Sequence, residues 1–151
     1  MCCNCCWFHS GVCFITDFAL TPLMNGRDVT DLNLAETNIT DRSLIAFAAH
    51  LPQLRCLNLS WCEELMAEDA DAMETFISAA SGLEHLKLRH LPVSERCLHQ
   101  LAIHCLNLRV LNLSNVNMGD SQLISIALRC RLLEDLDVSW NSGQLVSCYQ
   151  L

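Results

Sequence analysis

The residues best suited to chemistry in this sequence are its cysteines and histidines, which number 11 and 6. The chain opens with the run Met1-Cys2-Cys3-Asn4-Cys5-Cys6, and His9 follows closely. Overlapping C-x-x-C pairs beside an imidazole supply the ligands that Zn²⁺ prefers, but a structural zinc site needs a second ligand pair, which Cys13 alone does not provide. Three interpretations stay open: zinc binding, S-acylation of the clustered thiols, and an unstructured or artificial start. We therefore assign no metal or cofactor to the chain.

Catalytic motifs are missing from the sequence. It contains no G-x-S-x-G, no P-loop glycine pattern, no H-E-x-x-H and no G-x-G-x-x-G among its 5 glycines. The six histidines are dispersed, and no spacing among them repeats that of a known site; they are His9, His50, His85, His90, His99 and His104. We expect a protein without enzyme activity.

Composition and charge restrict the class of partner. With 151 residues and 52% hydrophobic content the chain is large enough for one domain. Its net charge of −8, from 17 acidic against 9 basic residues, argues against nucleic acid and anionic membranes as partners. Six of the acids fall within residues 63–74, which contain no Lys or Arg. We interpret that stretch as a solvated surface in preference to a docking patch.

The cysteine count is odd and no credible secretion signal precedes it, so a secreted disulfide scaffold is disfavoured. The apolar run 13–23 is interrupted by polar residues and falls short of the roughly 20 residues of a membrane span. We predict a reducing compartment, cytoplasmic or nuclear, with membrane attachment only if the amino-terminal cysteines are acylated.

The elements that position these residues are predicted by an internal repeat of the sequence. Apolar triplets of the form L-x-x-L-x-L begin at residues 29, 54, 83, 108 and 133, so the starts are 25, 29, 25 and 25 residues apart. Alternation within each triplet predicts a short strand, and the period is that of a leucine-rich repeat. The spacing of 29 is a unit of 25 with four residues inserted in the acidic stretch. The expected fold is an α/β leucine-rich-repeat solenoid of about 4.5 units, with a curved parallel sheet on the concave face and helices on the convex face.

The second half of each unit carries apolar residues at helical spacing, as in Leu44, Phe47 and Ala48. Helix starts are predicted at Thr40-Asp41, Ser94-Glu95 and Gly119-Asp120, where cap oxygens and negative charge suit unpaired N–H groups. The insertion is expected to precede the helix of the second unit.

Cysteines at particular places in the units make the chain resemble the cysteine-containing leucine-rich repeats of F-box adaptor proteins. Cys62 matches the cysteine after the strand, Ile39-Thr40-Asp41 matches the turn before the helix, and Cys105 and Cys130 match the helix-end cysteine. The cysteine position after the strand holds other residues elsewhere, namely Thr37, Leu91, Val116 and Asn141. The resemblance covers about residues 29 to 141 and implies substrate recognition within an SCF-type ubiquitin ligase, with Skp or cullin components as partners.

No F-box is recognisable, since residues 1–28 are too short and too rich in cysteine to form one. The alternative is a general leucine-rich-repeat scaffold without a ubiquitin role. We divide the chain into a cysteine-rich segment 1–28, a repeat domain 29–142 and a tail 143–151. Phe18, Leu20, Leu23 and Met24 are expected to cover the first strand. The fifth unit lacks its helix, which suggests a fragment or shortened product of a longer repeat protein.

Outward-pointing strand positions form the expected binding surface on the concave face. Its third row is basic (His85, Lys87, Arg89) and its fifth is acidic (Asp135, Asp137), so a protein partner with a mixed-charge segment is expected. Trp61 and Trp140 lie just past their strands, and tryptophan is enriched among interface anchors. The candidate binding residues are Asn33, Asn58, Trp61, His85, Lys87, Arg89, Asn112, Asp135, Asp137 and Trp140.

Overall fold

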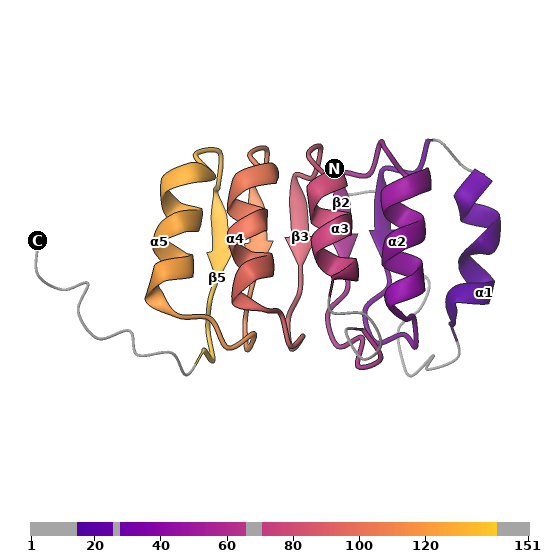
Figure 1. The fold of residues 1–151 in the computed structure, drawn as a ribbon, viewed down its shortest axis with the longest axis horizontal. Coiled ribbons are helices and arrows are strands. Elements are labelled where there is room, and N and C mark those ends of the chain that lie inside the picture. Colours follow the sequence, from indigo (N-terminus) through magenta and orange to yellow (C-terminus); the bar gives the residue numbers. More distant parts are fainter. Residues whose placement is uncertain (1–14, 26–27, 66–70, 142–151) are drawn as a thin grey trace, which may run out of the picture.

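The computed structural model describes residues 15–25, 28–65 and 71–141. Strands and helices alternate along the chain, as the apolar triplets and helical faces predict (Figure 1). The strands are β1 Asp31–Asn33, β2 Cys56–Asn58, β3 His85–Lys87, β4 Val110–Asn112 and β5 Asp135–Asp137. The helices are α1 Asp17–Leu20, the 3-10 helix η1 Thr21–Asn25, α2 Asp41–His50, α3 Ala72–Ala79, α4 Glu95–His104 and α5 Asp120–Arg129.

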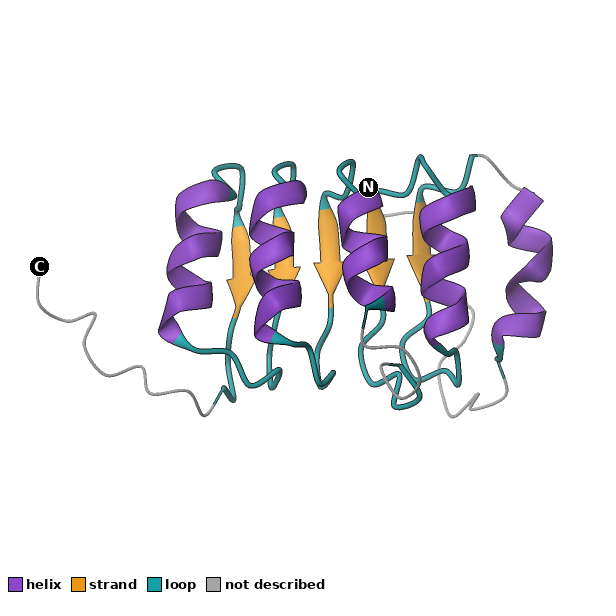
Figure 2. Cartoon of the chain, in the orientation of Figure 1, coloured by secondary structure: helices purple, strands orange, loops and turns teal. Residues whose placement is uncertain are grey.

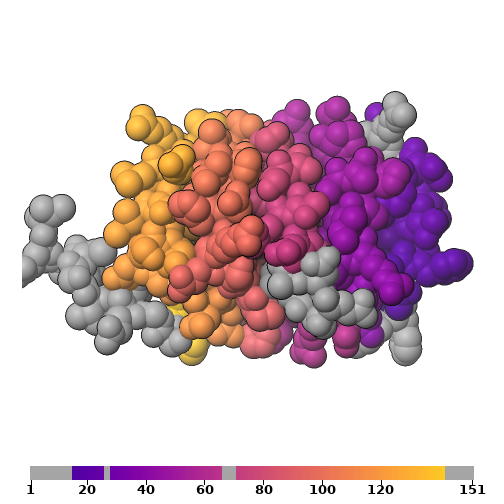
Figure 3. Space-filling view, in the orientation of Figure 1, coloured from indigo at the N-terminus to yellow at the C-terminus, as the bar shows by residue number. Residues whose placement is uncertain are grey.

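The five strands form one parallel sheet in the order β1-β2-β3-β4-β5. The register places Leu32, Leu57, Leu86, Leu111 and Leu136 side by side, so the central leucines of all units form one ladder. Helices α2 to α5 lie together on one side of the sheet, and no helix of the described residues lies on the other side (Figure 2). The space-filling view shows successive units as adjoining bands (Figure 3). This is the predicted α/β solenoid.

The core lies between the sheet and the helices, where each unit packs against its neighbours. Leu57, Leu86 and Leu111 are at most 2% exposed, and Phe47 and Phe76 from the helices are 1% exposed. Pairing extends beyond the three-residue strands, because backbone N–H groups of each unit continue to donate to carbonyls of the next, as in Leu59 N to Lys87 O at 2.9 Å. Short strands therefore suffice, since every unit shares its core with the next.

Three helices begin at the residues that the sequence predicts. Thr40 and Ser94 are the residues before α2 and α4, and their hydroxyl oxygens accept hydrogen bonds from Arg42 N (3.3 Å) and Cys97 N (3.0 Å). Gly119 precedes α5 and has no side chain to offer. Helix α3 begins at Ala72, after the four-residue insertion, as expected.

Helices α1 and η1 cover the amino-terminal end of the stack. Leu20 is 5% exposed, and Leu23 and Met24 are partly buried against the core, as the sequence predicts. The prediction was wrong for Phe18, whose side chain is 87% exposed. Phe18 precedes Leu20 by two positions, about 200° around a helix, so the two cannot share one face.

The last described unit is less buried than the units before it. Leu133, Leu136 and Val138 are partly exposed, whereas Leu108, Leu111 and their counterparts one unit earlier are buried. The predicted tail 143–151 and the amino-terminal cysteine run lie outside the described residues, so both predictions about them remain predictions.

Candidate protein-binding face

The sheet side without helices carries the predicted binding residues in two aligned columns. We call this surface the sheet face. One column holds the first residue of each strand: Asp31, Cys56, His85, Val110 and Asp135. The other holds the third: Asn33, Asn58, Lys87, Asn112 and Asp137. Because the residue between them in each strand turns toward the core, both columns face solvent in part or in full.

Four of the five residues in the second column hold the backbone of their own turn. Asn33, Asn58, Asn112 and Asp137 each accept, through Oδ1, a hydrogen bond from the backbone N–H two residues later, at 3.3, 3.1, 3.0 and 3.0 Å. This local bond is the one that Asn and Asp side chains favour in turns. Lys87 occupies the same position and has no acceptor oxygen. Sequence reasoning grouped these residues as contacts only and missed their turn-forming role, although Asn or Asp occupies this position in four of the five units.

Two carboxylates on the sheet face, those of Asp137 and Asp31, accept hydrogen bonds from neighbouring side chains. Asn112 donates from Nδ2 to Asp137 Oδ2 at 2.9 Å. Hydrogen bonds from the side chain and backbone of Ser139, together with Asn112 and the charge of Arg89, lower the pKa of Asp137. Thr30 donates to Asp31 at 2.7 Å and, with a smaller contribution from Cys56, lowers the pKa of that carboxyl. Both carboxylates therefore stay ionised well below neutral pH.

A ridge of left-handed residues borders the sheet face where the strands end. Its members follow the second column by three residues and have φ between 56 and 63°: Glu36, Trp61, His90, Asn115 and Trp140. Non-glycine residues seldom adopt this conformation. Backbone bonds between neighbouring units hold it, such as Trp61 N to Arg89 O at 3.0 Å.

Aromatic rings lie along this ridge. The rings of Trp61 and His90 stack with centroids 3.8 Å apart and planes at 23°, and the Arg89 guanidinium lies 5.7 Å from the Trp61 ring centroid. His90 Nδ1 also pairs with the Asn115 side chain. The structure thus brings predicted residues Trp61 and Arg89 together with His90, which sequence reasoning noted only as a neighbour of the basic row.

Trp140 lies apart from that stack and is 81% exposed. Between it and His90 lies a hollow of about 320 Å³, lined by His90, Leu91, Pro92, Asn115, Val116, Asn117 and Trp140. Most of the Trp140 ring is open to solvent at the border of the sheet face. The two predicted anchors are therefore separate features of one ridge.

The cysteines behind the resemblance serve packing. Cys62 is fully buried, and its Sγ donates to Leu34 O at 2.9 Å in the preceding unit. Asn141, at the same place in its unit, donates to Leu113 O at 2.8 Å across an equal sequence separation. Burial raises the pKa of the Cys105 thiol to about 12 and that of Cys97 to about 12. Such thiols are protonated and poor nucleophiles.

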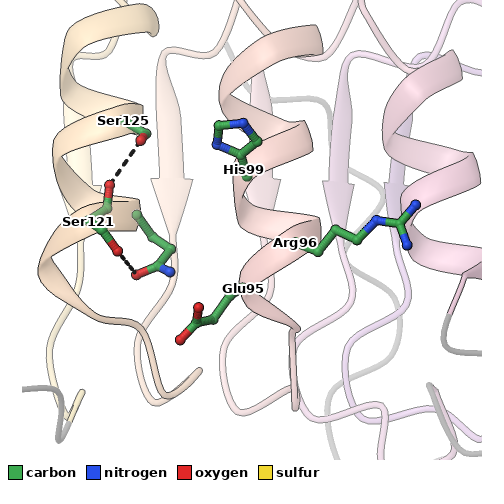
Figure 4. Close-up of a pocket in the computed structure, with 6 residues that line it drawn as sticks. Glu95, Arg96, His99, Ser121 and Ser125 are labelled. Carbon is green, nitrogen blue, oxygen red and sulfur yellow. Dashed lines mark hydrogen bonds between the residues drawn. The ribbon is translucent and has the colours of Figure 1, made fainter.

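A second hollow, of about 440 Å³, lies on the helix side between α4 and α5 (Figure 4). Glu95, His99, Ser121 and Ser125 are among its lining residues. Figure 4 shows the serine hydroxyls engaged within α5, Ser125 with Ser121 O and Ser121 with Gln122 Oε1, both at 2.9 Å. Their protons are directed to α5 and not to His99, so the group lacks the hydroxyl-to-imidazole bond of an activated serine.

Within residues 15–25, 28–65 and 71–141, no three His, Cys, Asp or Glu side chains are grouped closely enough to hold a metal ion. In the same ranges no helix has the length and apolar character needed to cross a membrane.

Comparison with known families agrees with the geometry. The model of the family described as Leucine Rich repeat matches residues 27–48, which hold β1 and most of α2. The fold is a leucine-rich-repeat solenoid. A search of curated proteins finds no match to the chain. The matched unit is the one that contains Ile39-Thr40-Asp41, the turn that sequence analysis relates to cysteine-containing repeats.

Proposed function

We propose that this protein is a non-enzymatic binding module that holds another protein on its sheet face. Leucine-rich-repeat solenoids offer an extended surface of regularly spaced side chains, which suits a protein segment better than a small molecule. The exposed tryptophans and the alternating charges on this face are the features that a partner would contact.

The observation that carries the proposal is Lys87. Four units place Asn or Asp at this position, and each uses the side chain to hold its turn. The central unit gives up that hydrogen bond for an exposed positive charge, beside the exposed Arg89. A local rule that is broken without structural gain points to function, because residues selected for binding are often not those that stabilise the fold.

We further infer that the bound protein is a substrate of an SCF-type ubiquitin ligase, for which this chain supplies the recognition part. The support is the resemblance carried by Cys62, Cys105, Cys130 and the Ile39-Thr40-Asp41 turn. A general scaffold without a ubiquitin role is the second candidate. It is favoured by the contacts of Cys62, which bonds a carbonyl of the neighbouring unit and so would serve any repeat protein.

The test is affinity capture from cells with the unmodified chain and two charge-reversed variants. Lys87→Glu/Arg89→Glu alters the sheet face, and Arg129→Glu/Arg131→Glu makes the same change of charge at exposed positions outside the strands. We expect the first variant to lose the main captured protein and the second to retain it, with similar thermal unfolding for both. Equal capture by both variants would refute binding through this face.

The captured proteins also separate the two candidates. Skp or cullin components that co-purify with the unmodified chain, together with ubiquitin conjugation of the captured protein that depends on the chain, support the ligase role. Capture that depends on the sheet face but brings no ligase component and no change in conjugation favours the scaffold.

A further inference from the structure

The sign of the charge on the sheet face changes between alternate strands, from β1 to β3 and from β3 to β5. In the two columns, the row of β1 is acidic through Asp31, the row of β3 is basic through Lys87, and the row of β5 is acidic through Asp135 and Asp137. Arg89, which is exposed two residues after Lys87, adds to the basic row. The rows of β2 and β4 carry no charged side chain in the two columns, where they hold Cys56, Asn58, Val110 and Asn112. Just before the columns, Arg55 pairs with Glu84 and Arg109 pairs with Glu134, so these charges compensate each other between neighbouring units. Within the two columns the order is acidic, neutral, basic, neutral, acidic.

The distance between charged rows favours one backbone conformation for a peptide segment that crosses them. Neighbouring strands lie about 4.8 Å apart, so alternate rows are about 9.6 Å apart. Three residues of a β-strand span about 10 Å, but residues i and i+3 of a strand point to opposite faces. A polyproline-II segment rises about 3.1 Å per residue with three residues per turn. Its side chains at i, i+3 and i+6 therefore lie on one face, about 9.3 Å apart, which matches the rows.

The aromatic ridge borders the path of such a segment at the strand ends. Trp61, His90 and Trp140 lie along the line of the strand ends, and the hollow beside Trp140 is open and lined partly by Pro92. Grooves lined by aromatic rings are the surfaces on which proline-rich segments dock, because the rings pack against the pyrrolidine faces and the segment is already extended before it binds.

We propose that the sheet face binds a proline-rich segment of a partner protein in which basic, acidic and basic residues follow one another at intervals of three. The segment crosses the strands, with its central carboxylate on Lys87 and Arg89, one basic residue toward Asp31 and the other toward Asp135 and Asp137. This inference rests on the proposed function and names the chemistry of the partner's segment.

The experiment measures binding of synthetic peptides to the full chain by calorimetry and tryptophan fluorescence. The test peptide is Arg-Pro-Pro-Glu-Pro-Pro-Arg, and the control is Arg-Arg-Pro-Pro-Pro-Pro-Glu, which has the same composition and net charge. We expect the control to bind at least about fivefold more weakly, because each misplaced surface ion pair forfeits about 0.2–1 kcal/mol. Binding of the test peptide should weaken with added salt.

A charge exchange makes the position of the central contact testable. Lys87→Glu/Arg89→Glu should bind the test peptide about tenfold more weakly and should prefer Arg-Pro-Pro-Arg-Pro-Pro-Arg, whereas Arg129→Glu/Arg131→Glu should behave as the unmodified chain. Equal binding of test and control peptides would overturn the inference. Tighter binding of a helical peptide with the same charges seven residues apart would overturn it as well, since a helix face rises about 10.5 Å over that interval.

The two proposals fail separately. Cellular capture that depends on Lys87 and Arg89, combined with no preference for the test peptide, removes the proline-rich segment and leaves the proposed function. If the test peptide binds specifically but cellular capture does not depend on Lys87 and Arg89, the proposed function is refuted. The peptide specificity of the sheet face then still stands.

Discussion

Replacing Lys87 by Asn should stabilise the protein and weaken its binding. Asn at this position restores the side-chain acceptor that Asn58 and Asn112 provide to the N–H two residues later, at 3.1 and 3.0 Å. The backbone at Lys87 is already in register with both neighbours, so the new side chain needs no rearrangement of the sheet. The same change removes a positive charge from the basic row.

The size of the effect follows from the bond that is added. A typical intramolecular hydrogen bond contributes about 0.5–1.5 kcal/mol net. Lys87 is exposed, so the lower half of that range, about 0.5–1 kcal/mol, applies here. For a chain of this length the gain corresponds to about 1–4 °C in Tm. The urea midpoint should rise by about 0.3–0.5 M at a slope of about 2 kcal/mol per molar.

Urea unfolding followed by circular dichroism measures the change, with Asn58→Lys as the matched opposite. That variant deletes the acceptor for Ser60 N and should lose about as much stability as Lys87→Asn gains. Binding of the proline-rich test peptide should weaken in Lys87→Asn. A Lys87→Asn protein that is no more stable than the unmodified chain, while Asn58→Lys is clearly destabilised, would refute the idea that position 87 exchanges stability for charge.

Further predictions concern the core and the amino-terminal cap. Leu111→Ala should lower the free energy of unfolding by about 2–5 kcal/mol through a buried cavity. Leu136→Ala, at the same repeat position but partly exposed, should cost about half as much; equal losses in urea titrations would contradict the lower burial of Leu136 as the cause. Asp17 accepts hydrogen bonds from Thr40 N (2.9 Å), Thr40 Oγ1 (2.7 Å) and Ser43 Oγ (2.5 Å). Burial raises the pKa of Asp17, but these bonds and the nearby Arg42 charge outweigh it and hold the pKa below 3.8. The ionised carboxylate therefore stabilises the fold above pH 3.8 and loses this effect as the pH falls through its lowered pKa. The stability difference between the unmodified chain and Asp17→Asn should shrink on acidification in urea titrations at stepped pH, and a constant difference would be inconsistent with the cap.

Much of the fold was predictable because the apolar triplet recurs along the sequence. A leucine triplet that recurs at intervals of 25 or 29 residues can bury its side chains only if the units stack in register, and the ladder from Leu32 to Leu136 has that register. The helix starts were predictable for a local reason, since Thr40 and Ser94 bond backbone N–H groups two or three residues away.

Where prediction failed or was incomplete, contacts between distant residues decide the outcome. The way in which α1 meets α2 is one example, since Asp17 fixes it by bonding Thr40 and Ser43, 23 and 26 residues later. The stack of Trp61 on His90 joins residues of neighbouring units, and it exists because both adopt left-handed backbone at equivalent places. Sequence spacing alone does not give those dihedral angles.

The sequence by itself determined which residues lie on the sheet face, because a strand that buries its central leucine must turn the residues on either side outward. Only the tertiary structure decided what those residues do there. Stacking at one unit per strand turns charged residues that are 50 or 54 positions apart in the sequence into rows a fixed distance apart. It also distinguishes Asn58 and Asn112, which hold their own turns, from Lys87, which is left free of that role.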